Sequence, residues 1–295
     1  MKVLIVAKKT NLELHGNQIN QSVLKGNLDK SYLKKLQQSH DEHYNTLDIL
    51  QRSLNKARID FELISRGLYW PKLKEIGLVI TVGGDGTILE ASHHLKNDNI
   101  PIIGIRSSKM SVGLLCACSE DKIPHLIEEL QNDSLVYLKA HRIYAEITFG
   151  QTGGNFSTEP VLNDFLFANK SPALTSRYNL QFNQVNEDQK SSGVWISTAT
   201  GSTAAIGAAG GQHIPRTSEE CQYRVRELYH SHTTRDSRLK SATFDPSSNV
   251  LAIDNHSDEA ILALDGQHGL IYLTFGDRLV FKRANPIPIL EKVSS

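Results

Sequence analysis

The sequence lacks the features that mark several large classes of protein. Its three cysteines, Cys116, Cys118 and Cys221, are too few for a disulfide framework, and Cys116-Ala-Cys118 does not have CxxC spacing. We expect buried thiols in a reducing compartment. No apolar run approaches the length of a membrane span, and the opening stretch MKVLIVAKKTNLEL has too short an apolar core for a signal peptide. These absences predict a cytoplasmic protein with no membrane partner.

An excess of charge of either sign is also absent. The 295 residues carry 32 basic and 32 acidic side chains, so the formal net charge is zero, and no block of like charge occurs. Proteins that bind nucleic acid usually present a basic face, and we therefore expect no nucleic-acid partner. An anionic ligand would have to be held locally, by backbone amides and a few side chains.

The first half of the chain alternates strand and helix patterns. Short apolar runs that fit strands covered on both faces occur at 2–7, 61–65, 78–82 and 100–105. Amphipathic helical spacing occurs at 32–58, 88–96 and 122–131, whereas the polar stretch 11–30 predicts a loop. This order predicts a doubly wound, Rossmann-like α/β domain over residues 1–137.

The pattern changes near residue 135. LVYLKAHRIYAEITFG (135–150) alternates as a half-buried strand does, and further short β runs follow it. A helical stretch, ISTATGSTAAIGAAGG (196–211), interrupts them. We therefore predict a β-rich, sandwich-like second domain over residues 138–276, with 277–295 as a candidate extension of the first domain.

The stretch ITVGGDGTILEAS (80–92) places a glycine-rich loop between a buried strand and a helix. Its glycines allow a ligand to approach the backbone closely, and amides at the start of a helix favour anions. It is neither a Walker A loop nor a GxGxxG fingerprint. Asp85 fits a tight turn, or a carboxylate that accepts a proton from an attacking hydroxyl or helps to hold Mg²⁺ through water. The buried strand before the loop favours the functional interpretation.

A second cluster of small residues lies at STATGSTAA (197–205), where Thr200, Ser202 and Thr203 surround Gly201. Its hydroxyls could donate to a sugar, a base or a phosphate. A helix that packs tightly on a sheet would also select alanine and glycine, so both interpretations stay open.

Together, GGDGT and TATGSTAA resemble motifs of the NAD kinase family, as do LND (162–164) and LDGQ (264–267). LTSRYNLQF and VGLLCA are most similar to the plant NADH kinases and their mitochondrial relatives. The resemblance implies transfer of a phosphoryl group to the 2′-hydroxyl of the adenosine ribose of NAD⁺ or NADH, which is bound between the two domains. It also implies ATP with Mg²⁺, or polyphosphate, as the donor, and a homodimer or homotetramer.

The resemblance also assigns roles to residues. Asp85 would be the base or orienting carboxylate, with Gly86 beside it, and no residue is assigned as a protein ligand of a metal. The other implied substrate-binding residues are Gly83, Gly84, Thr87, Asn163, Asp164, Lys190, Ser192, Thr200, Gly201, Ser202, Thr203, Ala204, Ala205, Asp265 and Gln267.

The sequence departs from the family pattern at a few of these positions. Asp164 replaces a usual Glu, Ala205 replaces a frequent Tyr, and Arg106 stands near a usual Asn. Ser192 stands where many members have an Asp expected near the nicotinamide. Because only the oxidised nicotinamide is cationic, the loss of that carboxylate predicts weaker discrimination against NADH, or a preference for it.

Two rival functions follow from the same motifs. A lipid or sugar kinase could share the GGDGT loop, and a non-catalytic dinucleotide sensor could share the binding residues. The polar run YHSHTTRDSR (229–238) fits either a solvated loop or a metal or phosphate site.

Overall fold

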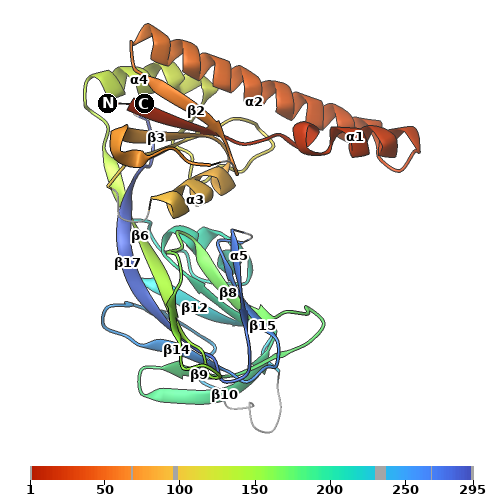
Figure 1. Cartoon of the computed structure of the whole chain (residues 1–295), viewed down its shortest axis with the longest axis vertical. Helices are drawn as coiled ribbons and strands as arrows, with labels where there is room; N and C mark the ends of the chain where they lie inside the picture. Colours follow the sequence, from red (N-terminus) through yellow and green to blue (C-terminus); the bar gives the residue numbers. More distant parts are fainter. Residues whose placement is uncertain (1, 68, 96–98, 230–236, 267, 294–295) are drawn as a thin grey trace. The chain divides into compact units, whose positions relative to one another are not determined.

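The computed structural model describes residues 2–67, 69–95, 99–229, 237–266 and 268–293, and the chain divides into two compact units (Figure 1). Unit 1 comprises Met1–Leu138 and Ile287–Ser295, and unit 2 comprises Lys139–Pro286. The C-terminal return to unit 1 therefore begins at residue 287 rather than 277. The reason is that β17 (Arg278–Leu290) pairs first with β14 (Leu251–Asn255) of unit 2.

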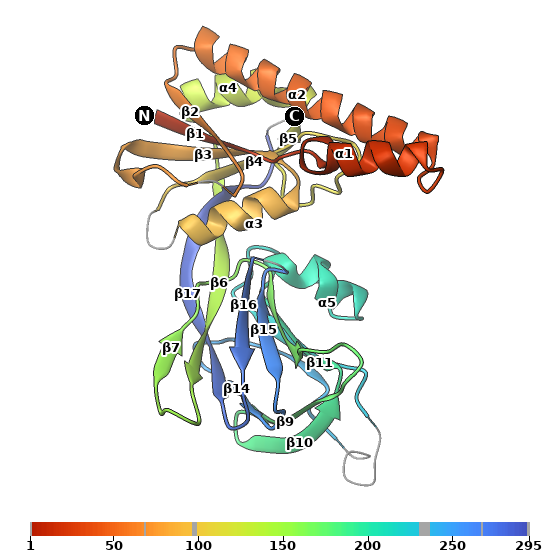
Figure 2. The same cartoon turned by 45° about the vertical axis from the view of Figure 1, so that its right-hand side comes forward.

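Unit 1 is built on a parallel sheet with helices on both faces. Its strand order is β2 (Phe61–Ser65), β1 (Lys2–Ala7), β3 (Ile76–Gly83), β4 (Ile102–Arg106), and β4 also pairs with β5 (Cys118–Ser119) and with Ile289 of β17. Helices α2 (Lys30–Lys56) and α4 (Ile123–Gln131) cover one face, and α3 (Asp85–His94) covers the other (Figures 1 and 2). The predicted α/β class is confirmed.

The prediction of a loop over residues 11–30 is wrong, because α1 occupies Asn11–Leu24. Thr10 and Glu13 form a capping box at its start: Thr10 Oγ1 accepts from Glu13 N at 3.4 Å, and Thr10 N donates to Glu13 Oε2 at 2.7 Å. A capping box satisfies amides that the first turn of a helix leaves without partners. Helix α1 buries none of its residues, so the apolar periodicity on which the prediction relied carries no signal here.

Unit 2 consists of two facing sheets with a hydrophobic core between them. One sheet contains β10 (Val185–Ser191), β9 (Ser176–Phe182), β14, β17, β6 (Tyr137–Thr148) and β7 (Asn155–Ser157). The other contains β13 (Ser241–Phe244), β12 (Cys221–Arg226), β11 (Gly193–Ser197), β8 (Asp164–Asn169), β15 (Ala260–Leu264) and β16 (Gly269–Leu273). Alternate residues of both sheets, such as Tyr178 and Phe165, fill the core, as in a β-sandwich.

The remaining elements of the described residues are short. They are η1 (Leu73–Glu75), η2 (Glu120–Lys122), η3 (Thr200–Thr203) and α5 (Ala205–Ala208), and the last two form the helical break predicted within the β-rich half. Residues 230–236 of the polar run at 229–238 lie outside the described residues. No described helix is both long and apolar enough to cross a membrane.

Candidate active site

The GGDGT loop forms the carboxyl end of β3 and the first turn of α3. Gly83 ends the strand, Gly84 is the N-cap, and Asp85 begins the helix. A Cβ added to Gly84 would lie 2.0 Å from Ser111 Oγ, so no larger residue fits there without a shift of Ser111. Ligands of open α/β sheets bind at this edge, outside the carboxyl ends of the strands.

The Asp85 carboxylate is oriented by two backbone amides. Leu115 N donates to Oδ1 at 2.7 Å, and Leu114 N donates to Oδ2 at 3.1 Å. An ionised carboxylate has about four acceptor positions, so both oxygens can accept a further proton or hydrogen bond. The geometry fits an acceptor held in one orientation at the start of a helix, where negative charge is also favoured.

The rest of the loop is held by its own backbone and by an ion pair behind it. Thr87 is buried, and its N–H donates to Gly84 O at 2.9 Å. Gly86 packs against the guanidinium of Arg66, which is paired with Glu90 of α3. The turn therefore keeps its shape through contacts within unit 1.

Helix α2 is linked to this loop through Ser107, the residue that follows β4. His43 Nδ1 lies 2.8 Å from Ser107 Oγ, and Ser107 N donates to Gly83 O at 3.0 Å. Burial, and next the charge of Lys8, lower the pKa of His43 to about 4, so this imidazole is neutral at physiological pH. Sequence reasoning missed His43 because its buried position on α2 is also typical of a core residue.

In unit 2, the LND segment is held on one side by Asp265. This carboxylate accepts hydrogen bonds from three successive amides: Leu162 N at 2.9 Å, Asn163 N at 2.8 Å and Asp164 N at 3.0 Å. Asp265 lies in the turn after β15 with a φ of +43°. Because its oxygens bind the backbone of the LND segment, we interpret Asp265 as a positioning residue.

The TATGSTAA segment holds the LND segment from the other side. Thr198 N donates to Asn163 O at 2.9 Å, and Thr198 Oγ1 donates to Leu162 O at 2.5 Å. A Cβ added to Gly201 would lie 2.2 Å from Asn163 O, so only glycine allows this approach. Three segments that are distant in the sequence thus form one polar cluster, which we call the LND cluster: residues 162–164, 197–201 and 265.

Two polar atoms of the LND cluster are buried without a hydrogen-bond partner among the described residues. They are Asn163 Oδ1 and Thr200 Oγ1. A buried polar group left unsatisfied costs about 1–3 kcal/mol, and natural proteins contain few of them. Both atoms belong to residues that the sequence assigned to substrate binding, and they indicate a ligand with complementary polar groups.

The electrostatics of the LND cluster are unusual. Burial, with a further contribution from the carboxylate of Asp265, raises the pKa of Asp164 to about 7. Burial lowers the pKa of Arg142, which is 1% exposed, to about 10, and Asp265 opposes this shift. Arg142 Nε donates to Asn285 O at 2.9 Å. No pattern in the sequence distinguishes Arg142 from the other charged residues of its strand.

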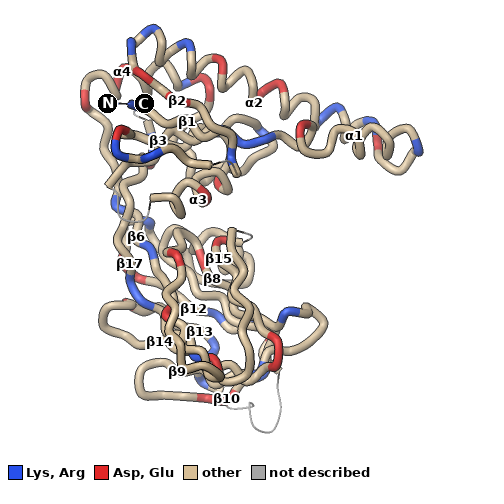
Figure 3. Tube along the Cα trace, viewed as in Figure 1, with Lys and Arg blue, Asp and Glu red and all other residues tan. Residues whose placement is uncertain are grey.

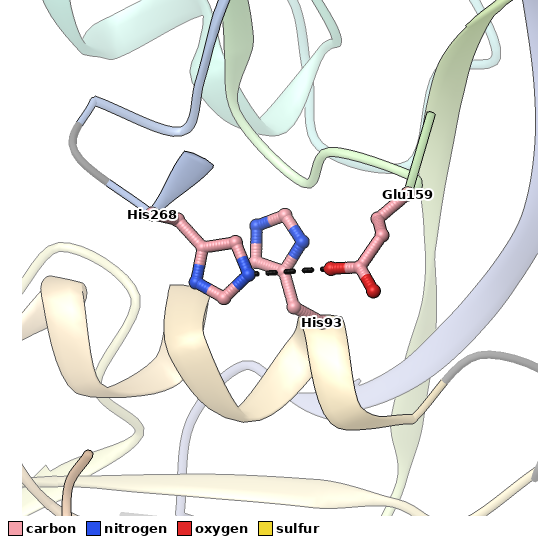
Figure 4. Close-up of side chains that lie close together, drawn as sticks. All are labelled: His93, Glu159 and His268. Atoms are coloured by element: carbon pink, nitrogen blue, oxygen red, sulfur yellow. Dashed lines mark hydrogen bonds and ion pairs between the residues drawn. The ribbon is translucent and has the colours of Figure 1, made fainter. Parts of the chain in front are cut away.

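The other predicted contacts of unit 2 fall into separate groups. Ser202 Oγ donates to Ile214 O at 3.2 Å and accepts from Ile214 N at 3.1 Å, so its hydroxyl supports the fold. Thr203 and Ala205 are exposed, and Ala204 is half-buried. Gln267 lies outside the described residues. The neighbouring His268 Nε2 lies 3.4 Å from Glu159 Oε2 (Figure 4).

Lys190 and Ser192 lie away from the LND cluster of the same chain. Ser197 of β11 pairs with Asp164, and Val194 pairs with Phe167, so Ser192 precedes the opposite end of the strand. At about 3.3 Å per residue, this end is well beyond contact distance of Asn163. Lys190 Nζ lies 4.8 Å from the centre of the Tyr229 ring.

A parallel α/β unit with a glycine-rich loop before a helix, together with a β-rich unit that presents unsatisfied polar groups, is the arrangement expected of a protein that binds a phosphate-bearing ligand. A family model described as the ATP-NAD kinase N-terminal domain matches residues 17–134. An NAD kinase of Clostridium tetani is 30% identical to this chain over 209 residues, which cover 69% of this chain and 70% of that protein. The chain belongs to the NAD kinase family.

Two further comparisons refine this result. A probable NADH kinase of Oryza sativa subsp. japonica is 28% identical over 267 residues, which cover 83% of this chain and 80% of that protein. The crystal structure of yeast NADH kinase complexed with NADH has a TM-score of 0.72 at 14% sequence identity, and the match covers 100% of this chain and 84% of that chain. The predicted resemblance to plant NADH kinases and the predicted two-part fold class are confirmed.

Proposed function

We propose that this chain transfers the terminal phosphoryl group of ATP to the 2′-hydroxyl of the adenosine ribose of NADH or NAD⁺. NAD(H) kinase activity is the activity of its family, and inorganic polyphosphate is the alternative donor. One observation in the chain itself carries the acceptor assignment. Asn163 Oδ1 and Thr200 Oγ1 are buried without partners in a cluster assembled from three separate motifs.

In the proposed reaction, the ribose 2′-oxygen attacks the γ-phosphorus of ATP. A bond forms between them, the bond from the γ-phosphorus to the β,γ-bridging oxygen breaks, and ADP leaves with that electron pair. Asp85 orients the 2′-hydroxyl and accepts its proton. General-base assistance contributes roughly 10²–10⁴ in rate, and positioning with electrostatic stabilisation supplies most of the remainder.

The roles of the LND cluster follow from its donors and acceptors. Asn163 Oδ1 accepts from the dinucleotide, from an adenine amino group or a ribose hydroxyl, and Thr200 Oγ1 can donate or accept. Asp164 is shorter than the usual Glu and is buried. Its pKa near 7 allows it to donate as an acid or accept as a carboxylate.

The residues present fit a magnesium ion that arrives with the nucleotide. The GGDGT loop supplies one carboxylate, Asp85, whose oxygens already accept from two amides. Mg²⁺ in phosphoryl-transfer sites takes most of its oxygen ligands from phosphates and water and few from the protein. When bound, the ion neutralises developing charge on the phosphates, while Asp85 orients the hydroxyl.

A preference for NADH, an oligomeric assembly and a cytoplasmic location are finer parts of the proposal. The preference rests on Ser192, which has no carboxylate to attract the cationic ring of NAD⁺. The assembly, a homodimer or homotetramer, rests on the family resemblance. The location is supported by Cys118 and Cys221, which are buried thiols outside any disulfide, as is usual in reducing compartments.

An assay of each phosphoryl donor with each candidate phosphoryl acceptor tests the proposal. The purified chain is assayed with ATP or polyphosphate against NADH, NAD⁺, diacylglycerol and fructose phosphate, and products are identified by mass spectrometry. We expect NADP(H) as the product. Phosphorylation of the lipid or sugar alone would identify the rival kinase, and binding of NADH without turnover would identify a sensor.

A further inference from the structure

A small cavity of unit 1 lies beside the GGDGT loop. Its volume is about 250 Å³, and Lys8, Lys9, Asn11 and Ser111 contribute polar groups to its lining. It adjoins the loop, because Ser111 Oγ would lie 2.0 Å from a Cβ on Gly84, and Lys8 Cβ would lie 3.4 Å from one on Gly83. Ligand pockets for whole drug-sized molecules usually exceed about 300 Å³, so this cavity suits a short anionic group.

Lys8 brings a partly buried positive charge to this cavity, and it forms no ion pair among the described residues. It follows β1, and its N–H donates to Val82 O of β3 at 3.0 Å, which fixes its backbone next to the loop. Within the described part of the chain, no carboxylate forms an ion pair with its ammonium group. Burial lowers the pKa of Lys8 below its ordinary value, and the more distant charge of Glu42 opposes that effect. A partly buried charge without a partner is costly, and a bound anion would remove that cost.

The walls of the cavity are fixed in advance. Ser39 Oγ of α2 donates to Ser108 Oγ at 2.8 Å, and Glu42 Oε2 accepts from Lys109 N at 3.0 Å. Ser111 N donates to Ser108 O at 3.1 Å, which places the Ser111 hydroxyl against Gly84. Figure 3 shows basic positions (blue) where β1 leads into α1, beside the acidic and basic positions of α2.

We infer that Lys8 and Ser111 form the subsite for the phosphates of the donor, whether these belong to ATP or to inorganic polyphosphate. The inference rests on the proposed function, and it adds two residues that lie outside the motifs of the family resemblance. The acceptor residues with unsatisfied atoms, Asn163 and Thr200, belong to unit 2, whereas the cavity and Asp85 belong to unit 1. We therefore expect a change at Lys8 to weaken donor binding more than recognition of the dinucleotide.

The test substitutes Lys8→Met, which keeps the apolar stem and removes the charge, and Lys8→Arg, which keeps the charge. Lys2→Met is the matched control, because Lys2 lies at the other end of β1 and pairs with Glu62 at 2.8 Å. We expect Lys8→Met to raise the KM for ATP and for polyphosphate at least tenfold, with the KM for NADH changed less than twofold. Lys8→Arg should restore part of the donor affinity, and Lys2→Met should leave all three constants within twofold.

Tripolyphosphate serves as a probe that needs no turnover. We expect calorimetry to show that it binds the wild type and the Lys2→Met variant, and that Lys8→Met weakens binding at least tenfold. An unchanged KM for ATP, or an equal rise in the KM values for ATP and NADH, would overturn the inference. If the wild type makes no NADP(H), the proposed function is wrong, but this result alone does not decide the subsite. Tripolyphosphate binding that is insensitive to Lys8→Met would then refute the subsite separately.

A loss of fold is checked by thermal melting. Because the Lys8 ammonium is partly buried and forms no ion pair with any described residue, Lys8→Met should melt at the same temperature as the wild type or higher. A melting temperature that is unchanged or raised, together with a weakened donor constant, supports a ligand role. A large drop in melting temperature for both Lys8→Met and Lys8→Arg would show that Lys8 supports the fold, and would contradict the subsite.

Discussion

In unit 1, both oxygens of the Asp85 carboxylate accept backbone hydrogen bonds, whereas in unit 2 Asn163 Oδ1 and Thr200 Oγ1 are buried with no partner in the described chain. The group assigned to chemistry is thus already oriented by the protein. The groups assigned to recognition are left for a ligand to satisfy. In catalysis by preorganisation, the reacting group is fixed before the substrate arrives. Selectivity comes from buried polar groups that only the correct substrate can pair.

The largest expected effect comes from Asp85→Asn. The amide cannot accept the proton of the 2′-hydroxyl, and kcat should fall by at least about 10²-fold, with NADH binding changed little. Steady-state kinetics and calorimetry with NADH measure the two effects. Asp48→Asn, which alters an exposed ion pair with Arg52 on α2, is the matched control. A well-folded Asp85→Asn variant with normal kcat would remove Asp85 from the mechanism.

Thr200→Val tests the recognition side of the comparison. The substitution keeps the shape of the side chain and deletes a hydroxyl that has no partner in the described chain. The KM for NADH should rise about tenfold, the equivalent of one hydrogen bond of about 1.4 kcal/mol. The melting temperature should stay constant or rise, because an unsatisfied buried group is removed. Thr243→Val, at an exposed position of β13, should change neither quantity. A stability loss with unchanged KM would indicate a purely structural Thr200.

The Ser192→Asp variant tests whether the residue at this position sets the preference between NAD⁺ and NADH. A carboxylate near the nicotinamide should raise kcat/KM for NAD⁺ relative to NADH by about fivefold, which corresponds to about 1 kcal/mol between exposed charges. Ser192→Asn separates the effect of charge from that of size. The ratio is measured with ATP at saturation. If the wild type already prefers NAD⁺ tenfold or more, the idea that Ser192 relaxes discrimination against NADH is wrong.

A separate effect concerns the pH dependence of stability rather than of activity. The pKa of Asp164 is raised to about 7 from an ordinary value of 3.8, so the folded state holds this proton more tightly than the unfolded chain does. The free energy of unfolding should therefore fall as pH rises from about 4 to about 7. Asp164→Asn should remove this loss, so its advantage over the wild type in melting temperature should be larger at pH 8 than at pH 5. Asp258→Asn, on the exposed surface of unit 2, should show no such pH dependence.

Much of the fold could be predicted because its elements bury apolar residues at regular spacing. Strands β1 and β3 are almost wholly apolar and buried, and α2 buries Leu47, Leu50 and Leu54. Helix α1 could not be found in this way, because it buries nothing and depends on the local capping by Thr10 and Glu13. The Thr10-x-x-Glu13 spacing of a capping box is the sequence signal that marks the start of this helix.

The sequence allowed prediction only of those site residues whose side chains take part in the expected chemistry. The GGDGT, LND and TATGSTAA motifs indicated Asp85, Asn163 and Thr200 as candidates, but the partners of Asp85 are the backbone amides of Leu114 and Leu115. Backbone amides have the same chemistry in every residue, so no sequence pattern identifies them. The role of Asp265 as a support for the LND segment likewise depends on a long-range contact that folding creates.

The central claim is that this chain phosphorylates the ribose 2′-hydroxyl of NAD(H) with Asp85 as the acceptor of the proton. The most direct measurement is the product formed from γ-labelled ATP and NADH by the wild type and by Asp85→Asn, with the position of the label determined by phosphorus NMR. The account predicts NADPH labelled on the adenosine 2′-oxygen for the wild type and almost none for Asp85→Asn. A label at another position, or equal product from both proteins, would contradict it.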